Sequence, residues 1–589
     1  MSRVARKTIH TSRTMRVDRL SVIKFGFGVV ACILSVRLFW VQVISHQKYT
    51  AMAANQHDVS RVLQPKRGQI FAQDQFAEDK LALVAGARTL YEVFLNPTIT
   101  KDHAEAVADI LVDTLQVDRD TMIARASKEK SLYAAVKHEV TQPEVDLLKS
   151  RLNESEIKGV YWDTEEARWY PEAQIMSALT GFVGYVGDTK KGQYGLEGYF
   201  QAELAGTAGS FSAQLDQGGR YIAAGEKDVT SAQNGDMLVL TVDRNIQYKA
   251  CTALQEAFEK FSAKSGSVII QNPKTGAILA MCSVPSYDAN EYSAVDDIAV
   301  YQNNAISYEY EPGSVMKAIA VAASVNEGKI TPYTTYDDVG EIRIQGFPIF
   351  NYTRRAYGTV DMITVLKESL NLGSVYAVQQ IGNEKWNHYM HDFGFGKETE
   401  ITLANEGSGD MSQVDKQEDV YTATSSFGQG MTATSLQMIQ AYAALANGGV
   451  MMKPYIVEQD IDANGLQRIT EPEEVSRPIT PETARTVAAM LVTVVDEGHS
   501  KGARVPGYSI AGKTGTAQVV NAKGEYDEHR HRDSFIGFAP VSDPQYVILV
   551  NLDEPQGVAT AEYSVVPVAG DINAFILNYL KIPPDRVSQ

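Results

Sequence analysis

The first strong pattern along the chain is a long apolar stretch near its start, residues 20–44. Its length of about 25 residues suits a helix that crosses a bilayer, which needs about 20. Lys24 and Arg37 lie toward opposite ends of the stretch, where long basic side chains can reach the headgroups. The stretch is long for a signal peptide and no small-residue cleavage site closes it, so it predicts an uncleaved transmembrane helix.

The residues before this helix are basic. Residues 1–19 hold six basic residues against one aspartate. Because positive charge flanking a membrane helix stays in the cytoplasm, we expect a cytoplasmic tail over 1–19, with the catalytic part of the chain extracytoplasmic or periplasmic, on a single-pass inner-membrane protein. The net charge of −18 over the whole chain argues against a nucleic-acid partner.

Beyond the anchor, residues 45–234 mix short strand patterns with charged helical ones. Residues 103–115 and 144–152 show helical spacing. Residues 46–66 indicate a helix that runs into an extended piece. Arg67 and Glu197 are expected to pair within this region, which carries no evident catalytic cluster and predicts a mixed α/β pedestal.

A different pattern begins near residue 235 and continues to about residue 583. Two strand patterns, 266–271 and 277–281, flank the turn Asn272-Pro273-Lys274-Thr275-Gly276, which predicts an antiparallel hairpin. Helices are expected over 243–260, 360–379, 432–447, 480–497 and 571–580, and further strands over 237–242, 508–520, 534–539 and 546–552. Strands, then helices, then strands predict an α+β domain whose antiparallel sheet is flanked by helices and accompanied by a helical subdomain.

Composition adds little to this division. Apolar content of 44% and charged content of 21% are ordinary for a folded protein. The three cysteines, Cys32, Cys251 and Cys282, form neither a disulfide framework nor a zinc-ligand spacing. We do not expect Cys251 to pair with Cys282 unless the fold brings them together.

Candidate chemistry starts with Ser314 and Lys317. Pro312 and Gly313 predict a turn, and an Ala-rich run then predicts a helix that lasts to about Glu327. A serine at a helix start, with a lysine one turn later, suits acyl transfer if the lysine is neutral, because the hydroxyl needs a base and the helix N-terminus favours a developing oxyanion.

The Ser-x-x-Lys spacing is weak evidence when it stands alone. It recurs four more times, at Ser21/Lys24, Ser45/Lys48, Ser127/Lys130 and Ser155/Lys158. Ser314 is distinguished by two later motifs in a fixed order: Ser369 and Asn371, which can relay a proton and orient an amide, and then Lys513-Thr514-Gly515-Thr516. The cation and hydroxyls of the last motif could hold a carboxylate, and Gly515 would leave room for substrate along the strand. The ordered set is typical of penicillin-binding proteins and class A β-lactamases.

With these motifs the chain resembles the class B penicillin-binding proteins, monofunctional peptidoglycan D,D-transpeptidases, of the division type represented by FtsI. The resemblance extends to residues 427–430, 511–517 and 534–540 and, in the pedestal, to Arg67-Gly68, 168–171 and 195–197. Ala173 departs from the family, which commonly has glycine there. The resemblance implies a pedestal, or dimerisation, domain over 45–234 and a penicillin-binding transpeptidase domain over 235–583.

The resemblance also implies a role for each motif residue. Ser314 would attack the penultimate D-Ala of a stem pentapeptide, with Lys317 as base and Ser369 passing a proton to the departing D-Ala. The remaining roles are a proton network at Lys513, binding of the donor peptide at Asn371 and Gly515, binding of its carboxylate at Thr514 and Thr516, and an oxyanion hole at the amides of Ser314 and Thr516. An amine of a second stem peptide would take the acyl group, and a D,D-carboxypeptidase side activity is allowed.

Partners are implied by the same resemblance. It implies D-Ala-D-Ala stem peptides, β-lactams that acylate Ser314, a SEDS-type glycan polymerase and other proteins of the divisome or elongasome; no metal or organic cofactor is expected. A β-lactamase and a non-catalytic β-lactam sensor are the rival functions. Chain length, the missing C-terminal extension and the compact N-terminal module favour septal division over elongation, which stays open.

Three other groups of side chains are predicted to be structural. His388, His391 and Asp392 are expected on a solvated helix face rather than at a metal. Residues 529–532, His-Arg-His-Arg, are expected in a solvated loop between two strands, at the rim of the site. Trp169, Tyr170 and Pro171 are expected to pack.

Overall fold

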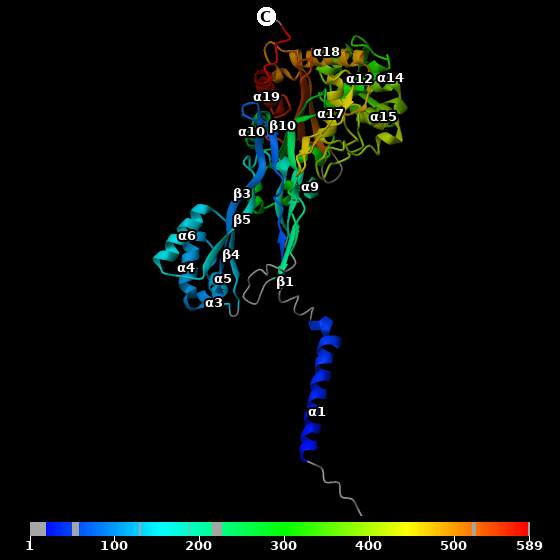
Figure 1. Cartoon of the computed structure of the whole chain (residues 1–589). Helices are drawn as coiled ribbons and strands as arrows, with labels where there is room; N and C mark the ends of the chain where they lie inside the picture. The colour runs from blue at the N-terminus through cyan, green and yellow to red at the C-terminus, as the bar shows by residue number, and fades with distance from the viewer. Residues whose placement is uncertain are drawn as a thin grey trace, which may run out of the picture. The chain divides into compact units, whose positions relative to one another are not determined.

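The structure is a computed structural model that describes residues 19–49, 58–128, 131–187, 189–214, 227–520 and 526–586 (Figure 1). The basic tail over 1–18 therefore lies outside the described residues. The chain divides into two compact units, one made of residues 1–65 and 207–233 and the other of residues 66–206 and 234–589.

The first unit contains the predicted membrane helix. Helix α1 (Arg19–Phe39) continues into one π-helical turn, η1 (Trp40–Ile44). Residues 22–44 are predominantly apolar, interrupted only by a few polar residues such as Lys24 and Arg37, with a mean hydropathy of 2.1 and no buried share within the protein. Among the described residues this is the one helix long and apolar enough to cross a bilayer. The unit also holds an antiparallel sheet in the order β1 (Asp58–Leu63), β8 (Gly209–Gln214), β9 (Lys227–Thr230).

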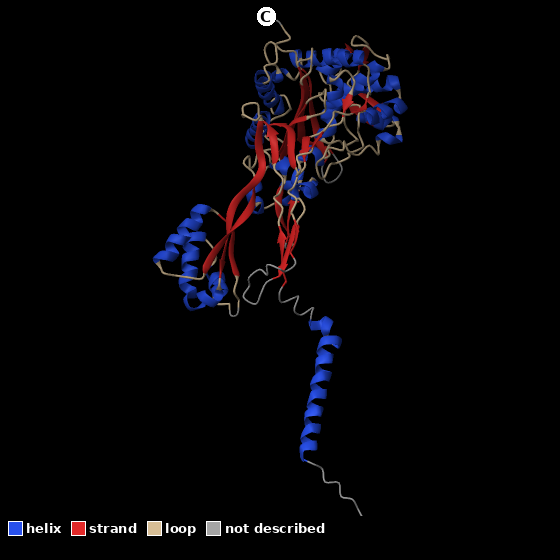
Figure 2. Cartoon of the chain, viewed as in Figure 1, coloured by secondary structure: helices blue, strands red, loops and turns tan. Residues whose placement is uncertain are grey.

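The second unit begins with a mixed sheet that spans the predicted boundary near residue 235. Its order is β19-β18-β10-β2-β3-β4, with β5 paired to β3. Figure 2 draws the strands of the chain in red. The strands of this sheet are β2 (Ile70–Gln73), β3 (Leu81–Leu95), β4 (Ala134–Val140), β5 (Val160–Trp169), β10 (Met237–Asp243), β18 (Val457–Ile461) and β19 (Gln467–Ile469). Strand β10 pairs parallel with β2 and antiparallel with β18, so pedestal strands and strands of the C-terminal region share one sheet.

Helices cover one face of the part of this sheet that contains β3, β4 and β5. They are α3 (Pro97–Thr100), η2 (Lys101–His103), α4 (Ala104–Leu115), α5 (Arg119–Ala126) and α6 (Gln142–Glu154). Val93 and Leu95 of β3 alternate into a core with Val107 and Leu111 of α4, as the period of two in a strand and of 3.6 in a helix requires. Shorter elements come next in the chain: α7 (Ser177–Thr180), β6 (Phe182–Val186), β7 (Thr189–Gln193), α8 (Gly195–Tyr199) and α9 (Gln201–Ala205).

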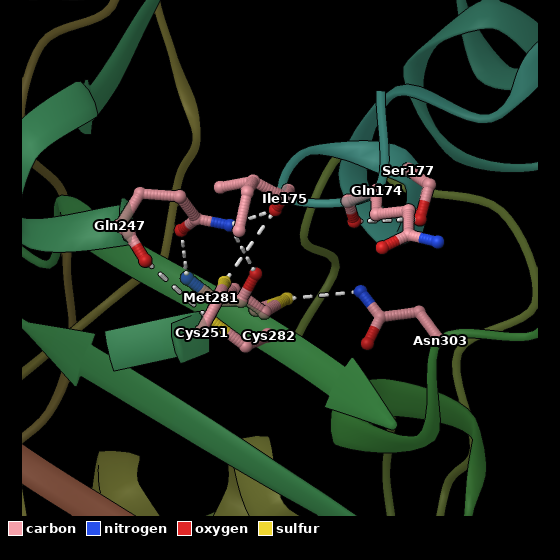
Figure 3. The surroundings of a disulfide bond; sticks show 8 residues. All are labelled: Gln174, Ile175, Ser177, Gln247, Cys251, Met281, Cys282 and Asn303. Atoms are coloured by element: carbon pink, nitrogen blue, oxygen red, sulfur yellow. Dashed lines mark hydrogen bonds between the residues drawn. A yellow bond between two sulfur atoms is a disulfide. The ribbon is translucent and has the colours of Figure 1, made fainter. Parts of the chain in front are cut away.

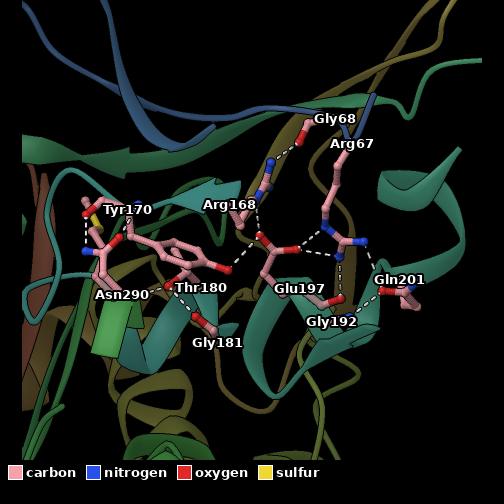
Figure 4. A network of polar contacts seen from close by, with 11 residues as sticks. Arg67, Gly68, Arg168, Tyr170, Thr180, Gly181, Gly192, Glu197, Gln201 and Asn290 are labelled. Atoms are coloured by element: carbon pink, nitrogen blue, oxygen red, sulfur yellow. Dashed lines mark hydrogen bonds and ion pairs between the residues drawn. The ribbon is translucent and has the colours of Figure 1, made fainter. Parts of the chain in front are cut away.

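The predicted ion pair of the pedestal is present and is part of a larger cluster (Figure 4). Arg67 Nε donates to Glu197 Oε2 at 2.6 Å, and Arg168 Nε donates to Glu197 Oε1 at 2.6 Å. Tyr170 donates to the same Oε1 at 3.3 Å, and Glu197 is fully buried. The buried carboxylate is thus matched by two guanidinium groups, as buried charges generally are.

The C-terminal region is built on a five-stranded antiparallel sheet in the order β12-β11-β23-β22-β21. Its strands are β11 (Ser265–Gln271), β12 (Ile278–Val284), β21 (Ala511–Val520), β22 (Tyr526–Ala539) and β23 (Tyr546–Asp553). The predicted hairpin is confirmed as β11–β12. Alternate residues face opposite cores: Ile270 packs with α10 (Arg244–Lys260) and α19 (Val565–Tyr579), and Ile269 packs with helices on the other side. Both faces are therefore covered, which explains the continuous apolar strands.

The helical subdomain lies on the second face of this sheet. Its helices are η3 (Ala289–Ala294), η4 (Ile298–Tyr301), α11 (Asn304–Ser307), η5 (Gly313–Val315), α12 (Met316–Asn326), α13 (Met362–Lys367), α14 (Asn371–Ile381), α15 (Asn383–Asp392), η6 (Val414–Lys416), α16 (Asp419–Ser425), α17 (Ser435–Ala446) and α18 (Pro481–Glu497). The short turn η7 (Lys501–Ala503), which follows α18, packs against α19 instead. The short strands β13 (Thr335–Asp338), β14 (Glu341–Ile344), β15 (Phe347–Phe350), β16 (Gly358–Asp361), β17 (Met451–Met452) and β20 (Glu474–Ser476) complete it. The predicted α+β class is confirmed.

Several element predictions need correction. The predicted helix over 360–379 is two helices, α13 and α14, separated at Ser369, whose φ is +58°. The last helix begins at Val565 rather than 571. Residues 529–532 lie in β22 rather than in a solvated loop. Arg532 is buried, pairs with Asp553 at 2.6 Å and stacks on Tyr308 and Tyr310.

The structure also answers the cysteine question that the sequence left open. Cys251 of α10 and Cys282 of β12 form a disulfide with a Cα–Cα distance of 5.4 Å (Figure 3). Gln247, one turn before Cys251, brings the two elements together, because its amide exchanges two hydrogen bonds with the backbone of Met281 at 2.9 and 2.8 Å. Helix packing on the hairpin therefore creates a pairing that cysteine spacing did not reveal.

Candidate active site

Ser314 lies in the short 3₁₀ turn η5, which leads directly into α12. Gly313 before it has a φ of +65°, and a Cβ there would lie 2.9 Å from the Cβ of Ala517 in β21. Glycine is therefore required both by the backbone conformation and by the close approach of the strand. The Gly313 N–H donates to the carbonyl of Gly428 at 3.0 Å, and Tyr442 donates to the carbonyl of Val315 at 2.8 Å. The nucleophile candidate thus sits on a turn that is held on three sides.

Lys317 lies in the first turn of α12 and is completely buried. Its Nζ donates to the carbonyl of Ser369 at 2.5 Å and lies 3.2 Å from the Ser369 hydroxyl. Among the described residues no hydrogen bond joins Lys317 to the Ser314 hydroxyl. Lys317 therefore connects the Ser314–Lys317 motif to the motif that contains Ser369.

Lys513 approaches the same serine from β21. Its Nζ donates to the Ser369 hydroxyl at 3.0 Å and to the carbonyl of Thr514 at 2.9 Å, and the residue is only 1% exposed. Ser369 has a positive φ, which is uncommon outside glycine, and its hydroxyl lies within hydrogen-bond distance of both lysines while its carbonyl accepts from Lys317. The ordered motifs of the sequence are thus brought to one point.

Burial is the dominant electrostatic influence on both lysines. It lowers the pKa of Lys513 to about 7. It holds the pKa of Lys317 well below its usual range, and the charge of Lys513 lowers that pKa further. Within the described part of the chain, neither lysine forms an ion pair with a carboxylate. Burial and the charge of Lys513 both favour the neutral form of Lys317, which is the form that can act as a base.

Asn371 begins α14, and its Nδ2 donates to the carbonyl of Phe350 at 2.9 Å. Because the amide nitrogen is held in this way, the side-chain oxygen is fixed as an acceptor. Asn351 supports the same helix start by accepting from the Leu372 N–H at 3.2 Å. A fixed acceptor suits recognition of a peptide N–H group.

Strand β21 forms the edge of the five-stranded sheet, so part of its backbone is available to an extended ligand. Glycine is needed at position 515 for a different reason from the one that the sequence suggested. A Cβ there would lie 2.6 Å from the Ser534 hydroxyl and 3.1 Å from the Pro312 carbonyl. The missing side chain lets β21 approach the turn that carries Ser314. Thr514 is largely buried, and the partly exposed Thr516 accepts a hydrogen bond from the Ala561 N–H at 3.1 Å.

Glu311 is a functional candidate that the sequence motifs did not reveal. Its Oε1 accepts from the Gly430 N–H at 2.7 Å and from the Tyr526 hydroxyl at 3.2 Å. Its other oxygen, Oε2, is buried and has no hydrogen-bond partner among the described residues. Burial raises the pKa of this carboxyl group. Its place three residues before Ser314 was the available signal, although Glu309 shows that charge in this segment is not distinctive by itself.

His388 and His391 lie on α15 with exposed side chains, which confirms the predicted solvated helix face. His388 lies 3.2 Å from Asp392, and His391 lies 2.8 Å from Asp415, so the two rings engage different carboxylates. The described residues contain no cluster of His, Cys, Asp or Glu arranged to hold a metal ion.

Comparison with known proteins identifies the same two regions. Residues 266–574 match the penicillin binding protein transpeptidase domain, and residues 62–240 match the penicillin-binding protein dimerisation domain. Stage V sporulation protein D of Bacillus subtilis is 31% identical, and the alignment covers 97% of this chain and 87% of that protein. Penicillin-binding protein PbpB of Mycolicibacterium smegmatis is 30% identical over 94% of this chain and 89% of its own.

Two further likenesses extend across nearly the whole length. A peptidoglycan D,D-transpeptidase FtsI homolog of Mesostigma viride is 28% identical and is covered, like this chain, to 96%. The crystal structure of penicillin binding protein 2X from Streptococcus thermophilus superposes with a TM-score of 0.72 at 24% identity, covering 88% of this chain and 80% of that one. At that identity the superposition establishes the fold.

Proposed function

Because this chain belongs to the penicillin-binding-protein transpeptidases, with both the transpeptidase and the dimerisation domains of that family, we propose that it cross-links peptidoglycan stem peptides through an acyl-enzyme at Ser314. We assign residues 235–583 to the transpeptidase domain, 45–234 to the pedestal, 20–44 to the membrane helix and 1–19 to the cytoplasmic tail. The convergence of two buried, unpaired lysines on Ser369 carries the proposal.

In the first half-reaction, Ser314 Oγ attacks the carbonyl of the penultimate D-Ala of a donor peptide. Lys317, kept neutral by burial, takes the hydroxyl proton, directly or through Ser369. As the C–N bond breaks, the Ser369 hydroxyl, held between Lys317 and Lys513, passes a proton to the departing D-Ala amine. The amides of Ser314 and Thr516 are the proposed oxyanion donors.

Donor binding is proposed from the geometry of β21. The peptide lies along this edge strand, with its amide facing Asn371 and its terminal carboxylate at Thr514 and Thr516. In the second half-reaction an amine of another stem peptide attacks the Ser314 ester, gives up its proton to the same network and restores the serine. A β-lactam enters the first half-reaction as a donor: its ring C–N bond opens and the acyl group stays on Ser314.

Labelling with a fluorescent penicillin tests this scheme. We expect stable labelling of the full-length protein, with the added mass on the Ser314 peptide, and no labelling of Ser314→Ala. Ser127→Ala, in another Ser-x-x-Lys match, is the control and should label normally. Rapid loss of the label would favour a β-lactamase, and cross-linking that survives in Ser314→Ala would favour a sensor.

The membrane arrangement is proposed in the same way. The chain is a single-pass membrane protein by its apolar helix and its relatives. The basic tail supports a cytoplasmic N-terminus, and the Cys251–Cys282 disulfide supports a catalytic region outside the reducing cytoplasm. We expect thiol-labelling reagents to leave this pair unmodified in intact cells until a reductant is added, whereas a cytoplasmic catalytic region would label directly.

We propose that the chain acts in septal division with a SEDS-type glycan polymerase. The division-type resemblance described above and the peptidoglycan D,D-transpeptidase FtsI homolog among the relatives support this role. Depletion distinguishes the branches: filaments indicate division, and rounded cells indicate elongation.

A further inference from the structure

Ser564 occupies the N-cap position of α19, yet it does not cap the helix. A serine at this position normally accepts a hydrogen bond from an N–H of the first turn. Here no such side-chain bond is present. The hydroxyl instead donates to Asp533 Oδ2 in β22 at 2.5 Å, and the residue is 1% exposed. Stabilisation of the helix start does not account for this side chain.

Its partner Asp533 is an unusual residue for the middle of a sheet. It is completely buried, and His531 Nε2 lies 3.5 Å from its Oδ2. Its Oδ1 is buried and has no hydrogen-bond partner among the described residues. A buried carboxyl group with an unpaired oxygen lowers stability, so a purely structural role would be better served by an apolar residue.

Asp533 lies directly opposite Thr516 in the β21–β22 pairing. Side chains that face each other across neighbouring strands share one face of the sheet, here the face toward α19. The Asp533–Ser564 bond therefore ties the start of α19 to the strand position next to Thr516.

The turn before α19 connects the two residues. Ala561 donates its N–H to Thr516 Oγ1 at 3.1 Å, and its carbonyl accepts from the Val566 N–H at 3.1 Å. The Tyr563 N–H donates to the Thr560 carbonyl at 3.1 Å and closes the turn. The N–H of Ala561 is thus fixed on Thr516, and its carbonyl is fixed on the first turn of α19. Asp533 holds the start of that helix through Ser564.

We propose that Asp533 and Ser564 are positioning residues that orient the Thr516 hydroxyl toward the carboxylate of the donor peptide. A threonine hydroxyl has one proton and two lone pairs. Because Ala561 donates to one lone pair, the proton of Thr516 remains available to donate to a carboxylate at the strand edge. The proposal rests on the carboxylate-binding role given to Thr516 above.

The test compares benzylpenicillin with its methyl ester, which lacks the charged carboxylate, on the full-length protein in detergent. For each ligand the second-order rate constant of acylation is measured for the wild type and for Ser564→Ala, Ser564→Thr, Thr516→Val and the double variant Ser564→Ala/Thr516→Val. Ser177→Ala, a buried serine of α7 that donates to the Gln174 carbonyl at 3.0 Å, is the matched control.

Ser564→Ala is expected to lower the acid-to-ester rate ratio about tenfold, Ser564→Thr to retain it, and Ser177→Ala to leave it unchanged. In the Thr516→Val background, Ser564→Ala should have no further effect, because the hydroxyl that it positions is gone. Asp533→Asn should reproduce the effect of Ser564→Ala and covers the case in which one variant fails to fold.

Two results overturn different claims. If Thr516→Val lowers the ratio and neither Ser564→Ala nor Asp533→Asn does, the positioning role is wrong and the proposed function is intact. If Thr516→Val leaves the ratio unchanged, the carboxylate-binding role of Thr516 is wrong, and the positioning role is wrong with it.

Discussion

Two buried groups of charged side chains in this protein are built on opposite principles. In the pedestal, Glu197 is enclosed by Arg67 and Arg168, so positive and negative groups meet within 2.6 Å. In the transpeptidase region, Lys317 and Lys513 converge on the neutral Ser369, and the described residues offer neither of them a carboxylate. The first arrangement stabilises the ionised form of its side chains, and the second favours the neutral form.

The difference separates a structural site from a chemical one. A matched ion cluster gains its stability from fixed geometry, and breaking it leaves an uncompensated charge. Two unmatched lysines in a dry site lower stability in their charged form and gain nothing from one another, so their placement supports the proton transfers proposed above, which neutral amines can perform. The same reasoning suggests a functional role for Asp533, because this buried carboxyl group is not matched by a guanidinium group as Glu197 is.

The largest expected effect concerns activity at Lys317. Lys317→Met retains the approximate volume and removes the base, so acylation by penicillin should fall by about 10²–10⁴-fold. The thermal unfolding midpoint should stay the same or rise, because a buried amine is replaced by an apolar group. Acylation rates and differential scanning fluorimetry are measured on the same preparations.

A large loss of stability in Lys317→Met, of the size expected for a structural ion, would remove the contrast with the pedestal. Lys385→Met is the matched control, because this lysine is exposed and pairs with Glu327 at the surface. It should leave acylation unchanged and alter stability only slightly.

The second expected effect is the converse and concerns Glu197. Glu197→Gln leaves two buried guanidinium groups without their counter-charge, so unfolding should become easier by about 3–5 kcal/mol. Acylation at low temperature should be unchanged, because the cluster lies in the pedestal away from the motif residues. Denaturant titration and penicillin acylation rates measure the two quantities.

Glu166→Gln provides the comparison for this prediction. Glu166 pairs with Lys66 at 3.7 Å and both side chains are more than half exposed, so its loss should alter stability by less than about 1 kcal/mol. Equal effects of the two substitutions would show that the buried cluster has no special weight.

The sequence predicted the local parts of this comparison and missed the tertiary ones. The ordered motifs identify Ser314, Ser369 and Lys513, because each motif is a short segment with its own turn or strand chemistry. The pairing of Arg67 with Glu197 was predicted, and the participation of Arg168 was missed. The positive φ of Ser369 depends on a helix break that apolar spacing does not record.

Long-range packing explains the remaining differences. The Cys251–Cys282 disulfide depends on the packing of α10 against the β11–β12 hairpin, which cysteine spacing cannot express. Residues 529–532 looked solvated because they are charged, yet β22 extends through them. Arg532 is satisfied there by Asp553 and by two tyrosine rings. A charged residue in a sequence is therefore expected to be exposed only if the fold supplies no partner for its charge.

The smallest expected effect is the pH dependence of stability that Lys513 contributes. Its pKa is about 7 in the folded protein and has the ordinary value of 10.5 in the unfolded chain. Between these values the unfolded state binds one more proton, so the free energy of unfolding should rise with pH by about 1.4 kcal/mol per pH unit from this group. Below pH 7 the group is protonated in both states and its contribution is constant. Buried tyrosines such as Tyr442, whose pKa burial raises, act in the opposite direction only above about pH 10.

The measurement is therefore the difference between Lys513→Met and the wild type from pH 7 to 9. Lys513→Met should be the more stable protein at pH 7, because methionine removes a buried amine that must lose its proton or remain charged in a dry site. Its advantage should shrink steadily toward pH 9, while Lys264→Met, whose lysine is 63% exposed, should show a constant difference. An advantage that does not change with pH would mean that Lys513 keeps its charge on folding. Its environment would then resemble the paired charges of the pedestal rather than the neutral amine that the proposed chemistry requires.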